Sequence, residues 1–196
     1  MIIQPALALL EFQSIAAGIV AGDAMVKRAP LDLIKAGTVQ PGKYLVLIGG
    51  QVADVEEAID AARAAQSGTL VDIVFLPDVH PDVVAAVAGA RRTDDGEALG
   101  IIETTTVAAV IQAADAGVKG ALVTIRELRT ADGLGGKGYL LFGGKVADVE
   151  AAVAIGSARV GGQLIGESVI AQLHGEMREN LSADGRFESV VRSKEE

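Results

Sequence analysis

The sequence predicts an α+β fold built from two copies of one unit, and three observations support this. The chain has 196 residues, which allows one or two domains at about 150 residues each. Half of its residues are hydrophobic but only 3% are aromatic, so the core must consist of Ala, Val, Leu and Ile. The third observation is an internal repeat, which sets the number of units at two.

Two pairs of matching segments define the repeat. Residues 11–27 and 103–119 are identical at 9 of 17 positions, with an offset of 92. Residues 49–58 and 143–152 are identical at 8 of 10 positions, with an offset of 94. This period is too long for a solenoid, whose repeats span ~20–50 residues, so we infer a tandem domain duplication. The predicted domains are residues 1–92 and 98–180, and a charged C-terminal tail follows at 181–196.

The first half of each unit is predicted as strand, helix and strand. In the first copy, residues 6–12 are apolar and form a buried strand. Ser14 can cap the following helix, which ends before Pro30, and residues 31–39 form the next strand. In the second copy Thr106 takes the place of Ser14, and the strand after the helix is expected at 121–128.

The second half of each unit is predicted as strand, helix and strand, with a short extra helix. In the first copy these are a strand at 44–48, a helix from about Val52 to Gly68, a strand at 70–76 and a helix from about Pro81. In the second copy a strand is expected at 139–142. The order β-α-β-β-α-β is the split βαβ, or ferredoxin-like, pattern, in which helices cover one face of an antiparallel sheet.

Composition excludes several classes of function. The net charge is −9, from 17 basic and 26 acidic residues, so no nucleic-acid partner is expected, because that binding depends on cationic contacts. No apolar run reaches the ~18–20 residues of a membrane span, and no lipid membrane is expected as a partner. The chain has no Cys, which removes disulfides, thiolate nucleophiles and cysteine-ligated clusters. The first residues contain no cationic leader of the kind that begins a signal peptide, so we predict a cytoplasmic protein.

One glycine-rich segment imitates a phosphate-binding motif. Residues 133–138 fit the pattern G-x-G-x-x-G. The mechanism needs a helix N-terminus that faces the phosphates, whereas this segment leads into a predicted strand. We therefore interpret it as a loop in which backbones approach closely.

The two histidines, His80 and His174, are related by the repeat. Neither has further His or carboxylate neighbours at the spacing of metal ligands, so no metal site is expected. A structural hydrogen bond at the start of a helix is the favoured interpretation.

Two lysines carry the most informative pattern. Lys27 and Lys119 each end a predicted helix, where the helix dipole favours a cation, and each follows an Asp by four residues. These effects explain each lysine separately. They do not explain why the whole string, DAMVK and DAGVK, occurs in both copies.

These strings, with the glycine-rich turns and GG-x-VADVE, resemble bacterial microcompartment shell proteins of the tandem-domain class. The markers are Glu11 and Glu103 at the strand ends, the two lysine strings, PGK at 41–43, and GGK at 135–137. The match covers residues 5–178. The resemblance implies that three chains form a trimeric pseudohexamer, a flat structural tile of a protein shell, with no enzymatic activity.

The resemblance also implies positions for a pore and for tile edges. It places Lys27 and Lys119 at the edge towards neighbouring tiles, and His80 and His174 occupy the family's edge histidine positions, although the arginine that accompanies them is missing. Expected partners are a homotrimer, hexameric and pentameric shell tiles, and small metabolites that cross the pore. The pore-lining residues are expected to be Thr38, Val39, Gln40, Pro41, Gly42, Asp132, Gly133, Leu134, Gly135 and Gly136.

One departure from the family bears on cofactors. A propanediol-utilisation subgroup has Cys immediately before PGK, where three thiolates hold an iron–sulfur cluster. This chain has Gln40 there, so we expect no cofactor and an open or gated polar pore. Two alternatives remain: a trimeric ligand-binding regulator built on ferredoxin-like units, and an enzyme that uses the histidines or Asp132.

Overall fold

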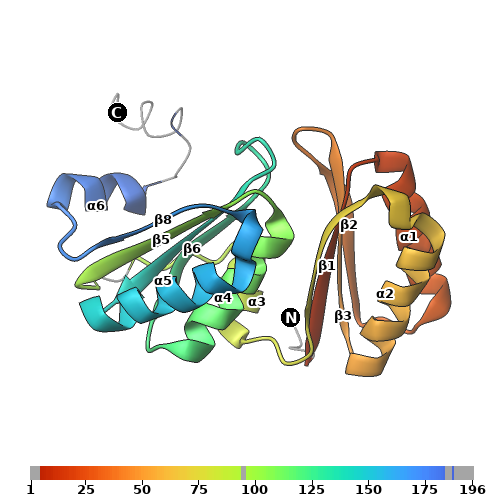
Figure 1. Ribbon diagram of the computed structural model, residues 1–196, viewed down its shortest axis with the longest axis horizontal. Helices are drawn as coiled ribbons and strands as arrows, with labels where there is room; N and C mark the ends of the chain where they lie inside the picture. Colours follow the sequence, from red (N-terminus) through yellow and green to blue (C-terminus); the bar gives the residue numbers. More distant parts are fainter. Residues whose placement is uncertain (1–4, 94–95, 184–186, 188–196) are drawn as a thin grey trace.

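The computed structural model describes residues 5–93, 96–183 and 187 of the chain. Within these residues the chain forms two units, each a four-stranded sheet with helices packed on it (Figure 1). The strand order is β2-β3-β1-β4 in the first unit and β6-β7-β5-β8 in the second. Neighbouring strands are antiparallel in both. The predicted split βαβ fold is therefore confirmed for both units.

The two units repeat the same elements in the same order. The first consists of β1 (Ala6–Phe12), α1 (Ile15–Arg28), β2 (Leu33–Val39), β3 (Lys43–Gly50), α2 (Val52–Gln66), β4 (Leu70–Leu76) and α3 (Pro81–Val87). The second consists of β5 (Ala98–Thr104), α4 (Val107–Gly120), β6 (Thr124–Thr130), β7 (Gly138–Gly144), α5 (Val146–Val160), β8 (Leu164–Ile170) and α6 (Gly175–Ser182).

Some predicted bounds are corrected. The prediction of a strand at 121–128 was too early, because Ala121 is the C-cap of α4 and Val123 donates to its carbonyl in a turn (3.0 Å). β6 starts at Thr124 instead and continues to Thr130. Helix α6 runs to Ser182, two residues into the segment expected as tail, most of which lies outside the described residues.

The predicted helix caps are confirmed. Ser14 Oγ accepts a hydrogen bond from Ala17 N–H (3.3 Å), and Thr106 Oγ1 accepts one from Ala109 N–H (3.2 Å). Each satisfies a backbone donor that has no partner inside its own helix. The caps therefore start α1 and α4 at equivalent positions of the two units.

The core continues across the boundary between the units. Leu9 of β1 and Val74 of β4 point away from α1 and α2, and they belong to the same buried cluster as Val107 and Ile111 of α4. Helix α4 consequently lies between the two sheets, and α3 packs on the second unit beside it (Figure 1). The sheet of the first unit is thus covered on one face by its own helices and on the other by the second unit.

Where the first helix of each unit crosses the third strand, one contact residue is large and the other is glycine. The glycine lies on the helix in the first unit and on the strand in the second. In the first unit, a Cβ added to Gly18 would lie 2.5 Å from the ring of Tyr44. In the second, Val110 occupies the position of Gly18, and a Cβ added to Gly138 would lie 2.4 Å from Val110. Each unit therefore has one large side chain and one glycine at this contact.

Candidate functional site

The two predicted pore loops lie next to each other on one side of the molecule, at the top in Figure 1. One joins β2 to β3 and the other joins β6 to β7 (Figure 1). Gln40 N–H donates to Asp132 Oδ1 across the loops (3.3 Å), and a Cβ on Gly136 would lie 2.8 Å from Pro41. Residues 92 positions apart in sequence therefore form one continuous rim.

The longer loop is held by its own backbone. Ala131 N–H donates to Lys137 O (2.9 Å), and Leu134 N–H donates back to Ala131 O (2.9 Å). Gly133 has a φ of 73°, in the left-handed region that glycine adopts without strain. The loop leads directly into β7 and not into a helix, so its geometry does not match a phosphate-binding loop.

The rim is mostly open to solvent. Among the ten predicted pore-lining residues, Gly136 is buried, Val39 and Leu134 are half-buried, and the others are exposed: Thr38, Gln40, Pro41, Gly42, Asp132, Gly133 and Gly135. Asp132 is the only one of the ten with a formal charge. The adjoining lysines are paired with carboxylates, Lys43 with Glu11 (2.6 Å) and Lys137 with Glu103 (2.8 Å).

The predicted edge residues lie away from the rim. Lys27 pairs with Asp23 (2.6 Å) at the end of α1, and Lys119 pairs with Asp115 (2.6 Å) at the end of α4. Lys119 Nζ also donates to the carbonyl of Asp78 in the first unit. Within the described residues, no other unit packs against Lys27 in the way that the first unit packs against Lys119.

The histidines are the N-cap residues of short helices. His80 precedes α3, and its Nδ1 accepts from Asp82 N–H (3.2 Å), which fits the structural role favoured from the sequence. His174 precedes α6 and makes no such side-chain bond. No group of three or more His, Asp or Glu side chains that could hold a metal ion is found in residues 5–93, 96–183 and 187.

The contact between the units includes a buried residue whose role sequence reasoning did not assign. Glu11 was noted only as a family marker, yet its carboxylate is fully buried and accepts from Val107 N–H, at the start of α4 (2.9 Å). The positive end of that helix dipole stabilises the charge. The only sequence signal was an acidic residue at the end of an apolar strand.

A second buried polar cluster lies on the sheet of the second unit. Glu127 pairs with Arg91 (3.1 Å) and accepts from the Tyr139 hydroxyl (3.0 Å). Burial, and then the neighbouring Glu127 carboxylate, raise the pKa of Tyr139 well above its ordinary value. The linker residue Arg91 therefore has a packing role, because it also donates to Leu181 O at the end of α6 (2.8 Å).

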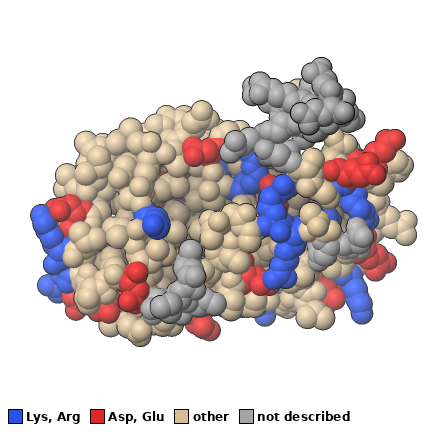
Figure 2. All heavy atoms as spheres, turned by 180° about the vertical axis from the view of Figure 1, so that it is seen from behind, with Lys and Arg blue, Asp and Glu red and all other residues tan. Residues whose placement is uncertain are grey.

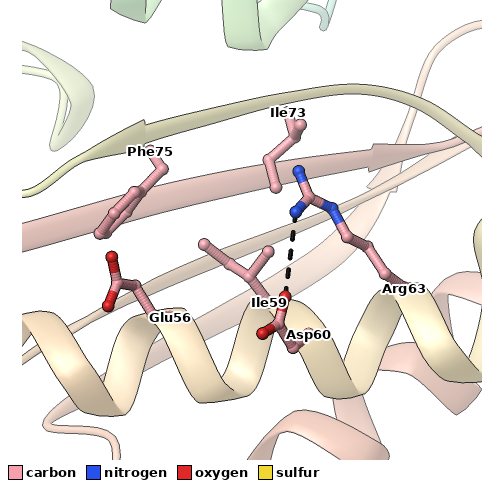
Figure 3. A pocket seen from close by; sticks show the side chains of 6 residues that line it. All are labelled: Glu56, Ile59, Asp60, Arg63, Ile73 and Phe75. Atoms are coloured by element: carbon pink, nitrogen blue, oxygen red, sulfur yellow. Dashed lines mark ion pairs between the residues drawn. The ribbon is translucent and has the colours of Figure 1, made fainter.

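A cavity of about 390 Å³ lies between α2 and β4 (Figure 3). Ile59, Ile73 and Phe75 form its apolar floor, and the Asp60–Arg63 pair borders it (3.9 Å). The cavity belongs to one unit, whereas the regulator hypothesis expects a cleft between subunits.

The molecular surface carries charges of both signs. On the face shown in Figure 2, basic and acidic side chains are interspersed, mostly over the second unit and at the outer end of the first. Ion pairs between surface side chains include Arg28–Glu57 (3.0 Å) and Arg92–Asp82 (2.9 Å). Among the described residues, no helix has the length and hydropathy to span a membrane.

Comparison with known proteins identifies the family. The BMC domain matches this chain twice, over residues 6–79 and 98–173. The chain belongs to the BMC-domain family of microcompartment shell proteins. Both matches fall inside the predicted domains 1–92 and 98–180, whose outer bounds remain predictions.

The relatives of these BMC domains are shell proteins. The bacterial microcompartment shell protein PduT of Citrobacter freundii is 42% identical over 174 residues, which are 88% of this chain and 95% of PduT. A microcompartment protein from Desulfitobacterium hafniense, of known crystal structure, is 40% identical, with a TM-score of 0.78 and coverage of 90% of this chain and 99% of that one. The shell protein PduA of Citrobacter freundii matches 82 residues at 35% identity, 41% of this chain and 88% of PduA.

Family membership gives this BMC-domain protein a structural role in a microcompartment shell, within the bacterial cytoplasm. The resemblance found in the lysine strings and glycine turns is thereby confirmed. The relatives compared are structural proteins and not enzymes.

Proposed function

We propose that the chain is a tile of the shell that assembles as a homotrimer, with six BMC domains alternating around a central pore. The observation that carries this proposal is an apolar face on α1. Ile19 is 53% exposed, whereas Ile111, at the equivalent position of α4, is 0% exposed beneath the first unit. Ile15, Val20 and Val26 are exposed on the same helix. An uncovered face of this kind marks an interaction site, and a second copy would cover it as the first unit covers α4.

The pore would form where the paired loops of three chains meet. Glycines let the backbones crowd around a narrow axis, and the Gln40 side chain offers both a donor and an acceptor. Three copies of Asp132 would add three negative charges at the rim. The role follows as selective passage of small metabolites without covalent chemistry, a cofactor or a metal.

Assembly into a shell would use the tile edges. Lys27, Lys119, His80 and His174 are proposed to face neighbouring tiles, both hexameric and pentameric. Since each chain carries a net charge of −9, flat tiles repel one another unless such local cationic contacts oppose the repulsion. Replacement of both lysines by Ala should abolish sheet formation, whereas trimers should still form, because their association rests mainly on apolar burial. Sheets that persist in this double variant would show that the edge assignment is wrong.

Electron microscopy of the purified protein, together with sedimentation velocity, tests the proposal. The expected particles contain three 20.0 kDa chains, have a hexagonal outline with a central pore, and pack into flat arrays. Monomers at all concentrations would contradict it. Isolated trimers that bind an effector tightly, measured by calorimetry against nucleotides and amino acids, would favour the ligand-binding regulator.

A further inference from the structure

Polar contacts define the seam between the two units of one chain. Glu11 accepts from Val107 N–H (2.9 Å) and pairs with Lys43 behind it (2.6 Å). Further along the seam, Asp115 Oδ1 accepts from His80 N–H (2.9 Å), while Lys119 donates to Asp78 O. The pair with Lys43 lies within the first unit, and each of the other three contacts joins a side chain of one unit to the backbone of the other. The seam is therefore closed at both ends by charged groups.

The side-chain pairs of these contacts occur again, at the repeat-related positions, on the two surfaces of the chain that face away from the seam. The pair Glu103–Lys137 repeats Glu11–Lys43, and the pair Asp23–Lys27 repeats Asp115–Lys119 at the same 2.6 Å. The difference is exposure. The Glu11 side chain is 0% exposed and that of Glu103 is 39% exposed. The Asp115 side chain is 8% exposed and that of Asp23 is 57% exposed.

We propose that these two exposed pairs are the complementary halves of a seam between protomers, which a second copy of this chain closes. Glu103 accepts from Ile15 N–H of the next copy, as Glu11 accepts from Val107 N–H. Asp23 accepts from His174 N–H of the preceding copy, and Lys27 donates to its Gln172 carbonyl. The inference rests on the proposed trimer and names the residues that hold it together.

The two surfaces differ from each other, so the contact is heterologous and must close into a ring or continue as a filament. A ring leaves no pair uncovered. Closure also brings the apolar face of α1 against the second sheet, where Ile101 and Ile170 occupy the positions of Leu9 and Leu76. Apolar burial would supply most of the association energy, and the carboxylates would fix the register.

The seam between protomers is not an identical copy of the seam within the chain. Within the chain, the Thr106 hydroxyl donates to the Asp72 carboxylate. The strand register puts Gly166 at the position of Asp72, and Ser14 stands at the position of Thr106. A side chain added to Gly166 meets nothing within 4 Å. This empty place is where a covalent link can test the geometry.

The test is a disulfide between protomers in the variant Ser14→Cys, Gly166→Cys. The chain contains no native Cys, so every bond formed comes from the introduced pair. Oxidation of the full-length protein should give dimers and trimers on a non-reducing gel, whereas each single variant cannot form a mixed link and should not give trimers. Asp72→Cys with Thr106→Cys is the matched control, expected to close within one chain and give monomers.

A second variant measures the contribution of the carboxylate. Loss of one partner in a buried charged contact should raise the concentration at which Glu103→Gln trimers dissociate by at least about tenfold. Glu150→Gln, an exposed acid on α5, should leave this concentration unchanged. If the wild-type protein is a trimer but the double Cys variant does not cross-link and Glu103→Gln does not weaken the trimer, the proposed seam is wrong. A wild-type monomer would instead overturn the proposed function.

Discussion

The exchange of large and small residues between the units leads to a sharp prediction for Gly138→Ala. The added Cβ would lie 2.4 Å from Val110 Cγ1 and 2.5 Å from Val110 Cβ, far inside van der Waals contact. Both residues are buried between α4 and the second sheet, where overpacking costs typically ~1–3 kcal/mol. For a chain of this size, each kcal/mol lowers the melting temperature by about 2–4 °C.

The assay is thermal and urea unfolding followed by circular dichroism, at one fixed protein concentration because association shifts the apparent stability. The double variant Val110→Gly, Gly138→Ala removes the clashing side chain and should recover part of the loss, although glycine within a helix costs about 1 kcal/mol. Gly166→Ala is the control, since its added Cβ meets nothing within 4 Å. Wild-type stability of Gly138→Ala, or additive losses in the double variant, would refute the packing argument.

Three further predictions concern single side chains. Glu11→Ala should lower the free energy of unfolding by about 3–5 kcal/mol, because it leaves Lys43 and Val107 N–H without their buried partner, whereas Glu150→Ala should change it by less than about 0.5 kcal/mol; urea titration measures both. Ser14→Ala should lower the free energy of unfolding by about 1 kcal/mol, because α1 loses its cap. If a second substitution has already removed the hydrogen bond of Ala17 N–H, Ser14→Ala should cost less, and an equal cost in that background would contradict the cap. Because the pKa of Tyr139 is raised on folding, the unfolded chain loses that proton first, and stability should fall as the pH rises above about 10. Tyr139→Phe should reduce this fall, and an unchanged pH profile would contradict the assignment.

Local patterns in the sequence predicted the elements well, and for local reasons. Hydrophobic periodicity and the caps Ser14 and Thr106 act within one or two helical turns. The glycine segment at 133–138 could be separated from a phosphate loop because the next residues read as a strand. The error at β6 has a local cause too, since the apolar residues that follow α4 form a turn before the strand begins.

The candidate site was predicted as a set of residues, but its internal contacts were not. The resemblance proposed both loops, and the structure brings them together through Gln40 and Asp132. The buried role of Glu11 and the part played by Arg91 could not be foreseen, because each partner lies far along the chain, at Val107 and at Glu127.

By itself, the sequence determined that two copies of one fold follow each other, with a lysine string and a glycine-rich turn in each. Repeat matching treats equivalent positions as equal, and so it could not distinguish Asp23 from Asp115 or Ile19 from Ile111. Only the tertiary structure decided which member of each pair is covered, because burial depends on the face of the first sheet against which α4 packs. That asymmetry, absent from the repeat, leaves one helix face and two charged pairs of the chain exposed for a second copy to cover.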